Sequence, residues 1–188
     1  MRELALHVLD ILQNTVEAGA TRVTLTIRED VPADLLTITV ADNGRGMDAA
    51  TVTHVTDPFF TTRTTRHVGL GLPLYAMAAE QAGGRLHITS EPGIGTTVRA
   101  EFQLSHPDRQ PFGDMAGTLL AFLLSERTPE LRYEHRLRQD PAPDDDRTFE
   151  FDTADFRAEL GDVPFSHPAV VQWLAEFLEE GENVLRSA

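Results

Sequence analysis

The first twenty residues carry apolar side chains at helical spacing. Within residues 3–18 they recur every three or four positions, and Gly19 ends the pattern; they are Leu4, Val8, Ile11, Leu12 and Val16. Such spacing places one apolar stripe along a helix, so this segment is predicted to be an amphipathic helix that packs on a core.

Similar patterns predict the other elements up to residue 105. Alternating or β-branched runs indicate strands, and a helical pattern with Pro73 in its first turn indicates a second helix. In chain order these are strands 22–28 and 36–41, helix 73–82, and strands 85–90 and 96–104. Helices separated by strands that directly follow one another predict an α/β fold, a two-layer α/β sandwich with a mixed sheet.

The remaining residues, 106–188, are predicted to form a small α+β appendage. Ser166 is placed to cap the last helix and Gly181 to end it. The expected elements are helix 114–126, strands 130–138 and 147–152, and helices 153–160 and 167–180. The chain is therefore divided into two parts, residues 1–105 and residues 106–188.

Charge differs between the two parts. Of the net charge of −14, residues 1–105 carry −4 and residues 106–188 carry −10. An acidic surface repels phosphate backbones, so nucleic acid is not expected as a partner. The acidic second part is expected to contact other proteins, and whether the chain forms a homo-oligomer stays open.

Two residue types are missing, and their absence excludes several chemistries. All 16 basic residues are Arg, so there is no lysine for a Schiff base or a Walker P-loop. There is no Cys, so disulfides, thiolate metal sites and cysteine nucleophiles are excluded. The first residues do not match a targeting signal, and no apolar run approaches the roughly 20 residues of a membrane span. A cytoplasmic protein without membrane contact is expected.

The first predicted helix also has a polar stripe, formed by His7, Asp10, Asn14 and Glu17. Their spacing puts them on one helix face, which by itself is typical of a surface that faces solvent. Alternatively, Asp10 and Asn14, one turn apart, direct a carboxylate and an amide oxygen to the same place. A hydrated Mg²⁺ and an attacking water need such oxygens.

A second motif, DNGRGM (42–47), directly follows the second predicted strand. Asn-Gly is a strong hairpin signal, but a polar, helix-like segment follows here instead of another alternating strand. Gly44 and Gly46 allow a ligand to approach the backbone closely. A carboxylate such as Asp42 at a strand end can accept a hydrogen bond from an exocyclic amine.

A third motif, GLGL (69–72), comes directly before the second predicted helix. Free N–H groups at a helix N-terminus bind phosphate oxygens, although a lone Gly-x-Gly is weak evidence and is usually a plain loop. The preceding residues include Arg63, Arg66 and His67, the one locally basic stretch of an acidic chain. A mobile lid over an anionic ligand, with Arg63 as a ligand contact, is therefore expected here.

These motifs occur in the order found in GHKL ATPases, the superfamily of gyrase, the ninety-kilodalton heat-shock chaperones, histidine kinases and MutL-type mismatch-repair proteins. LDILQNTVEAGAT (9–21) resembles the N box, DNGRGM (42–47) the adenine-binding box, GLGL (69–72) the second glycine box and GTT (95–97) the last box. The resemblance covers residues 4–104 and is strongest to the catalytic domain of sensor histidine kinases. It implies a Bergerat-type sandwich.

The resemblance also implies roles for individual residues. Asn14 would bind Mg²⁺, Asp42 would accept a hydrogen bond from adenine N6, and Thr97 would support that carboxylate. Asp10 stands where ATP-hydrolysing members have a glutamate general base, and it is one methylene shorter. The adenine pocket would be lined by Gly44, Gly46 and Met47, and the phosphates approached by Gly69, Leu70, Gly71 and Leu72. His67 departs from the family, which has a glycine there.

The implied function is binding of ATP and Mg²⁺ with phosphoryl transfer to a separate protein, as in a histidine kinase or an anti-sigma-type serine kinase. Histidine kinases carry their phosphoacceptor upstream of the N box, and no His here is followed by Glu or Asp, so the acceptor is expected on a partner. Two alternatives stay open: a regulatory module with little turnover, and a weak ATPase with Asp10 as base. Surface or core roles are expected for His54, His87, His106, His135 and His167.

Overall fold

Helices and strands follow one another nearly as the apolar pattern predicts. The computed structural model describes residues 3–56, 70–125, 127–140 and 146–187. In chain order the elements are α1 (Leu4–Glu17), β1 (Arg22–Asp30), β2 (Leu35–Asp42), α2 (Ala49–His54), α3 (Gly71–Gln81), β3 (Arg85–Glu91), β4 (Gly95–Gln103), α4 (Met115–Leu123), β5 (Glu130–Arg138), β6 (Asp146–Asp152), α5 (Thr153–Leu160) and α6 (Pro168–Arg186).

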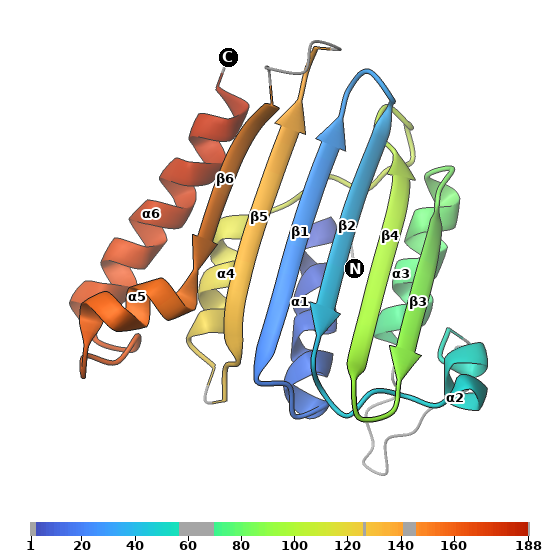
Figure 1. The fold of residues 1–188 in the computed structure, drawn as a ribbon. Helices are drawn as coiled ribbons and strands as arrows, with labels where there is room; N and C mark the ends of the chain where they lie inside the picture. Colours follow the sequence, from blue (N-terminus) through green and yellow to red (C-terminus); the bar gives the residue numbers. More distant parts are fainter. Residues whose placement is uncertain (1–2, 57–69, 126, 141–145, 188) are drawn as a thin grey trace.

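The strands form one six-stranded sheet in the order β3-β4-β2-β1-β5-β6 (Figure 1). All neighbouring strands are antiparallel except β1 and β5, which pair in parallel. The sheet is therefore mixed, and the predicted α/β sandwich is confirmed. Strands β5 and β6, from the predicted appendage, extend the sheet of the first part, so the two parts share it.

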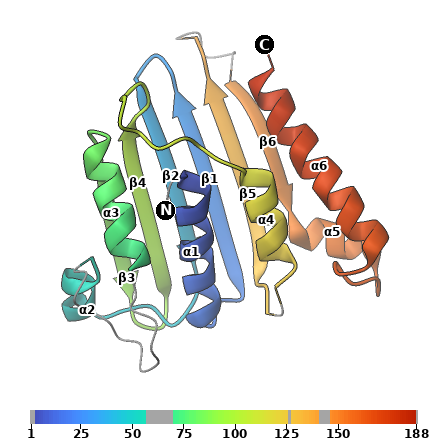
Figure 2. The same cartoon turned by 180° about the vertical axis from the view of Figure 1, so that it is seen from behind.

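The helix layer covers one face of this sheet, with α1 between α3 and α4, and α6 packed against α4 and β6 (Figure 2). Successive residues of a strand point to opposite faces, and the residues on the covered face form the core. The core of β1 and α1 consists of Val23, Leu25, Ile27, Leu4, Val8, Ile11 and Leu12, each at most 2% exposed. Within the described part of the chain, no helix combines the length and apolar character needed to cross a membrane.

The segment between β4 and α4 crosses the helix layer and closes the N-terminus of α1 (Figure 2). The N–H groups of Leu4 and Ala5 donate to the carbonyl oxygens of Pro111 and Phe112 at 3.0 and 2.9 Å. The first N–H groups of a helix have no partner within it, and Glu3 makes no side-chain cap here. This segment therefore fixes the start of α1 and joins it to the second part of the chain.

The last helix is longer than predicted. It begins at Pro168 and continues to Arg186, past the expected end at Gly181. A Cβ at position 181 would lie 2.2 Å from Cε2 of Phe149, so this glycine allows α6 to pack closely on β6. The predicted helix stop at Gly181 is therefore wrong, because this glycine is needed for packing within a continuous helix.

Two other helix ends also differ from the prediction. His167, rather than Ser166, caps α6, because its Nδ1 accepts from the N–H of Ala169. Helix α4 ends at Leu123, earlier than predicted, and the hydroxyl of Thr128 donates to one of its last carbonyl oxygens. A side chain that binds the final carbonyls stabilises a helix end without a glycine.

Candidate functional site

Residues from three predicted motifs lie together at the end of the sheet where β2 stops, between α1 and α3 (Figure 1). Asp42 is the last residue of β2, Asp10 and Asn14 lie on α1, and Gly71 begins α3. Residues 57–69 lie outside the described residues, and with them the predicted lid, Arg63 and Gly69.

The polar stripe of α1 is buried at its start and exposed at its end, where Glu17 lies. His7 is 1% exposed and stacks on Tyr75 of α3, with ring centroids 5.0 Å apart. Burial lowers the pKa of His7, and its hydrogen bond with Gln110 only partly offsets this, so the ring is neutral at pH 7. Asp10 and Asn14, further along the same stripe, are half-buried. His7 and Asp10 of the stripe therefore contact α3.

The carboxylate of Asp10 lies against the first turn of α3. A Cβ at position 71 would lie only 1.5 Å from Oδ2 of Asp10, so the glycine leaves the space that this carboxylate occupies. The first N–H groups of a helix have no partner within it and favour anions. Leu72 packs against the core, whereas Leu70 is 42% exposed. A carboxylate and a helix N-terminus therefore border the same space.

Asp42 provides a half-buried carboxylate at the end of β2. Its Oδ1 accepts from the N–H of Gly44 at 2.7 Å. Burial raises the pKa of Asp42, and hydrogen bonds from the backbone of Gly44 and Thr96 offset this only in part. The side chain lies on the helix-covered face, as does that of Val40 two residues earlier. It is a hydrogen-bond acceptor shielded from bulk water.

The loop after Asp42 is held between α1 and the turn that joins β3 to β4. Gly46 has a φ of +65°, and a Cβ there would lie 2.0 Å from the carbonyl oxygen of Glu91, so no other residue fits without strain. The N–H of Arg45 donates to the carbonyl oxygen of Ala18, at the end of α1, at 2.9 Å. This placement brings the loop backbone beside the Asp42 carboxylate.

Thr96, rather than Thr97, lies beside Asp42. In the register of β2 and β4, Asp42 pairs with Thr96 and Ala41 pairs with Thr97. Paired residues turn their side chains to the same face, so Thr96 shares the covered face with Asp42 and Thr97 points to the opposite face. Thr97, which is expected from the resemblance to support the Asp42 carboxylate, therefore points away from it. The sequence predicts the strand, but it does not determine which of its two alternating sets of side chains points toward the helices.

Ser90 links the loop after Asp42 to β4. No role for this serine is predicted from the sequence. Its Oγ accepts from the N–H of Met47 at 2.8 Å and donates to the carbonyl oxygen of Gly95 at 2.9 Å. It also lies 2.9 Å from Oγ1 of Thr96, its partner in the register of β3 and β4. A single serine within a strand carries no signal until the strands are paired.

The residues on α1 fit a magnesium ion that is shared with a phosphate. Among the described residues, no group of three or more His, Asp or Glu side chains is placed to hold a metal. Mg²⁺ usually takes only one or two protein oxygens and completes its shell with water and phosphate oxygens. Asp10 and Asn14 offer a carboxylate and an amide oxygen on one face of α1, which matches that need.

Comparison with known proteins agrees with this geometry. A family model described as "Histidine kinase-, DNA gyrase B-, and HSP90-like ATPase" matches residues 2–106. The crystal structure of the N-terminal domain of a DNA repair protein has a TM-score of 0.54 with 14% sequence identity, over 80% of this chain and 52% of that chain. The shared fold therefore extends beyond the residues that the family model matches.

Several similar proteins of known sequence are named as sensor kinases. The sensor protein kinase FleS of Pseudomonas aeruginosa is 40% identical over 90 residues, which cover 47% of this chain and 22% of FleS. The signal transduction histidine-protein kinase AtoS of Escherichia coli is 37% identical over 98 residues, which cover 51% of this chain and 16% of AtoS. The chain thus spans less than a quarter of either relative.

Proposed function

Because this chain belongs to the histidine kinase-, DNA gyrase B- and HSP90-like ATPase family, we propose that it binds ATP with Mg²⁺ between α1, α3 and the end of β2. The observation that carries this proposal is the contact of the Asp10 carboxylate with Gly71 at the start of α3. Asp42, at the end of β2, adds a second, half-buried carboxylate. The site thus combines a helix N-terminus for phosphate with an acceptor for a base amine.

In the proposed complex each part of the site has one task. The Asp42 carboxylate accepts from the adenine amine, and the base lies against Gly44, Gly46 and Met47. The N–H groups of Leu70, Gly71 and Leu72 at the start of α3 bind phosphate oxygens. Gly69 and Arg63, which lie outside the described residues, are proposed to contact the phosphates as well. When bound, Mg²⁺ neutralises charge on the phosphates, and the amide oxygen of Asn14 contributes to holding it.

We further propose that the γ-phosphoryl group is transferred to a separate protein. The similarity to the catalytic domains of sensor histidine kinases supports this step. Phosphoryl transfer needs mainly positioning and charge neutralisation, so few groups have to react. Asp10 would orient the attacking group and take up its proton.

Purified protein incubated with γ-labelled ATP, alone and with candidate partner proteins, tests both proposals. Label that appears on a partner supports the kinase, and release of labelled phosphate without a partner supports a weak ATPase. Binding without either would leave a regulatory module. If ATP does not bind at all in the presence of Mg²⁺, the proposed function is wrong.

One observation favours the regulatory module as a second candidate. Gln110, in the segment that closes α1, lies 3.0 Å from Nε2 of His7, and His7 stacks on Tyr75 of α3. The segment that leads to the second part therefore contacts α1 directly and is linked to α3 through His7. Hydrogen exchange in α6 with and without ATP tests this candidate, which requires that ATP changes the exchange rates there.

A further inference from the structure

We propose that Ser90 makes the site selective for a purine with a 6-amino group, by fixing the direction of the Thr96 hydroxyl. This proposal rests on the proposed binding of ATP. Ser90 belongs to none of the motifs that suggest the site, and it reaches the site only because β3 pairs with β4.

The direction in which the Thr96 hydroxyl donates its proton follows from the number of protons in the hydrogen bonds around Ser90. A serine hydroxyl has one proton and two lone pairs. The N–H of Met47 uses one lone pair of Ser90, at 2.8 Å. The carbonyl oxygen of Gly95, at 2.9 Å, has no proton to give and must receive the one on Ser90.

The third contact then has only one satisfactory arrangement. Oγ1 of Thr96 lies 2.9 Å from Oγ of Ser90, whose own proton is already given to Gly95. Thr96 must therefore donate its proton to the remaining lone pair of Ser90. All three contacts are satisfied in this way, and the Thr96 hydroxyl is left with lone pairs only.

This leaves two acceptors side by side at the proposed base site. Thr96 and Asp42 are register partners with side chains on the same face, so their Cβ atoms lie about 4.5–5.5 Å apart. An ionised carboxylate also only accepts. A 6-amino group has two N–H donors for this pair, whereas a 6-oxo group presents a lone pair to an acceptor.

The alternative is that Ser90 only anchors the loop through Met47. Loss of such an anchor would lower the affinity for every purine nucleotide by the same factor, since the loop backbone does not distinguish between a 6-amino and a 6-oxo group. Selectivity, measured as the ratio of two dissociation constants, separates the two roles.

The experiment measures Kd for ATP and for inosine triphosphate, which has the 6-oxo group, with the full chain by calorimetry. In Ser90→Ala the Thr96 proton is free to turn toward a 6-oxo group, so we expect the preference for ATP to fall about tenfold, the effect of one hydrogen bond. Ser90→Thr keeps the hydroxyl and should keep the wild-type ratio. Equal weakening of both nucleotides in Ser90→Ala would overturn the proposal.

Thr96→Val gives an independent test if Ser90→Ala does not fold. This change removes the acceptor that faces the 6-oxo group, so the preference for ATP over inosine triphosphate should fall here too. Thr96→Ser keeps the hydroxyl and should keep the wild-type preference. Thermal unfolding without nucleotide checks that each variant is folded. Wild-type protein that binds no ATP contradicts the proposed function itself, whereas wild-type protein that binds ATP and inosine triphosphate equally contradicts only the role of Ser90.

Discussion

The ring of Phe112 stacks on the imidazole of His135, with centroids 5.3 Å apart and ring planes at 14°. Phe112 belongs to the segment that closes the N-terminus of α1, and His135 belongs to β5. The guanidinium of Arg186, in the last turn of α6, lies 4.6 Å from the centroid of the same phenyl ring. All three residues lie in residues 106–188, so these contacts hold the segment that closes α1 against β5 and α6.

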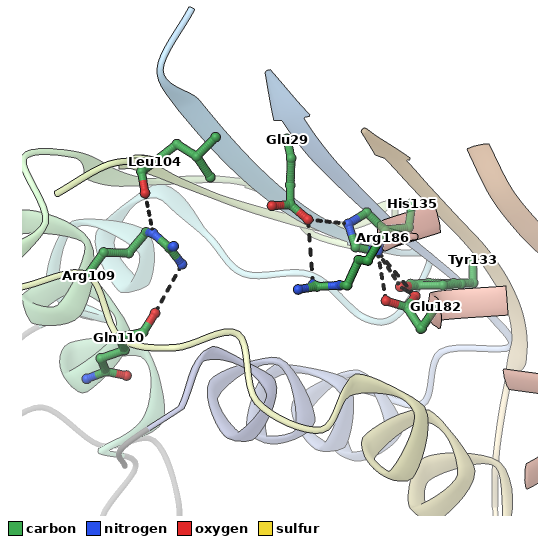
Figure 3. Close-up of polar contacts among 8 residues, drawn as sticks. All are labelled: Glu29, Leu104, Arg109, Gln110, Tyr133, His135, Glu182 and Arg186. Atoms are coloured by element: carbon green, nitrogen blue, oxygen red, sulfur yellow. Dashed lines mark hydrogen bonds and ion pairs between the residues drawn. The ribbon is translucent and has the colours of Figure 1, made fainter. Parts of the chain in front are cut away.

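His135 is fully buried and bridges two carboxylates (Figure 3). Its Nε2 lies 2.9 Å from Oε1 of Glu29 in β1, and its Nδ1 lies 3.1 Å from Oε2 of Glu182 in α6. The hydroxyl of Tyr133 also donates to Glu182, and Arg186 lies 3.6 Å from Glu29. Both ring nitrogens lie within hydrogen-bonding distance of a carboxylate, an arrangement that favours the doubly protonated imidazolium.

The charges of this cluster predict a dependence of stability on pH. Burial lowers the pKa of His135, but hydrogen bonds with Glu182 and Glu29 outweigh burial and raise it above its ordinary value. A raised pKa in the folded state gives stability that is present below the unfolded pKa, about 6.5, and is lost as pH rises through the folded pKa. For Glu29, burial raises the pKa, but His135 and Arg186 lower it overall. Its contribution is present above the ordinary pKa of Glu and is lost as pH falls through the lowered value.

We expect Glu182→Gln to lower the free energy of unfolding by about 1.5–3 kcal/mol near pH 6, because the imidazolium loses a charged partner in the core. The loss should shrink as pH rises past the pKa of His135, since a neutral ring does not need a second carboxylate. Urea unfolding at a series of pH values measures this. Glu180→Gln, on the exposed side of the same helix, should change little. A loss that is the same at every pH would show that His135 is neutral.

Phe112→Ala tests how firmly the segment that closes α1 is held against β5 and α6. Phe112 is 8% exposed, and truncation of a buried phenylalanine typically costs about 3–5 kcal/mol. The helix cap should survive, because it uses the backbone carbonyl of Phe112. Chemical unfolding measures the loss, and Leu124→Ala, at a position 38% exposed, is the control. A cost below about 1 kcal/mol would mean that the stacked rings contribute little beyond an ordinary surface contact.

Local pattern predicts the elements well but not how they are paired. The alternation of Val23, Leu25 and Ile27 depends only on neighbouring residues, so β1 could be predicted from the sequence. The parallel pairing of β1 with β5 joins residues far apart in the chain, and no local signal encodes it. Which strand residues face inward follows from that pairing, and a shift of one position moves a side chain to the other face. The confusion of Thr97 with Thr96 is such a shift.

Some of the functional residues discussed above could likewise be proposed from the sequence, and others could not. Asp10, Asn14 and Asp42 could be proposed from the sequence because each lies in a short motif and the order of the motifs resembles a known family, and their roles stay predictions. The cluster around His135 could not, because His135 is 106 residues from Glu29 and 47 from Glu182. A charged residue at the predicted end of a helix is typically exposed, and Glu182 is buried only because α6 continues past Gly181.

Asp42→Asn should weaken ATP binding tenfold or more, because a hydrogen bond to a charged acceptor contributes about 1.5–3 kcal/mol. Burial raises the pKa of Asp42, so the carboxylate takes up a proton at a higher pH than an exposed aspartate. ATP affinity of the wild type should therefore fall on acidification, starting above the usual range of aspartate. Calorimetry across pH measures both effects, and the exposed Asp162→Asn is the control. Unchanged affinity in Asp42→Asn would remove Asp42 from the base site.

Gly71→Ala should weaken ATP binding at least tenfold, about 1.4 kcal/mol, since the new methyl group needs the space of the Asp10 carboxylate. Gly117→Ala is a matched control, because a Cβ there would lie 2.2 Å from Oδ2 of Asp114, at the start of α4. Both variants press a methyl group against a carboxylate at a helix N-terminus, but only the first does so at the proposed site. Nucleotide titration should separate them, and equal losses would place the phosphates elsewhere.

Asp10→Asn tests whether the Asp10 carboxylate acts in the reaction. An amide cannot take a proton from an attacking hydroxyl, so we expect turnover to stop while ATP affinity changes little. Compared with glutamate, aspartate withdraws the carboxylate by roughly 1.5 Å, one C–C bond, and misplacement on that scale can cost about 10²-fold in rate. Hydrolysis without a partner should therefore be slow, and Asp10→Glu should leave its rate unchanged or raise it.

Release of labelled phosphate and nucleotide affinity are measured together, with Glu80→Gln on the exposed side of α3 as the control. Full phosphoryl transfer by Asp10→Asn would show that this carboxylate only shapes the contact between α1 and α3, whereas weaker Mg²⁺-dependent binding would show that it orders a metal-bound water.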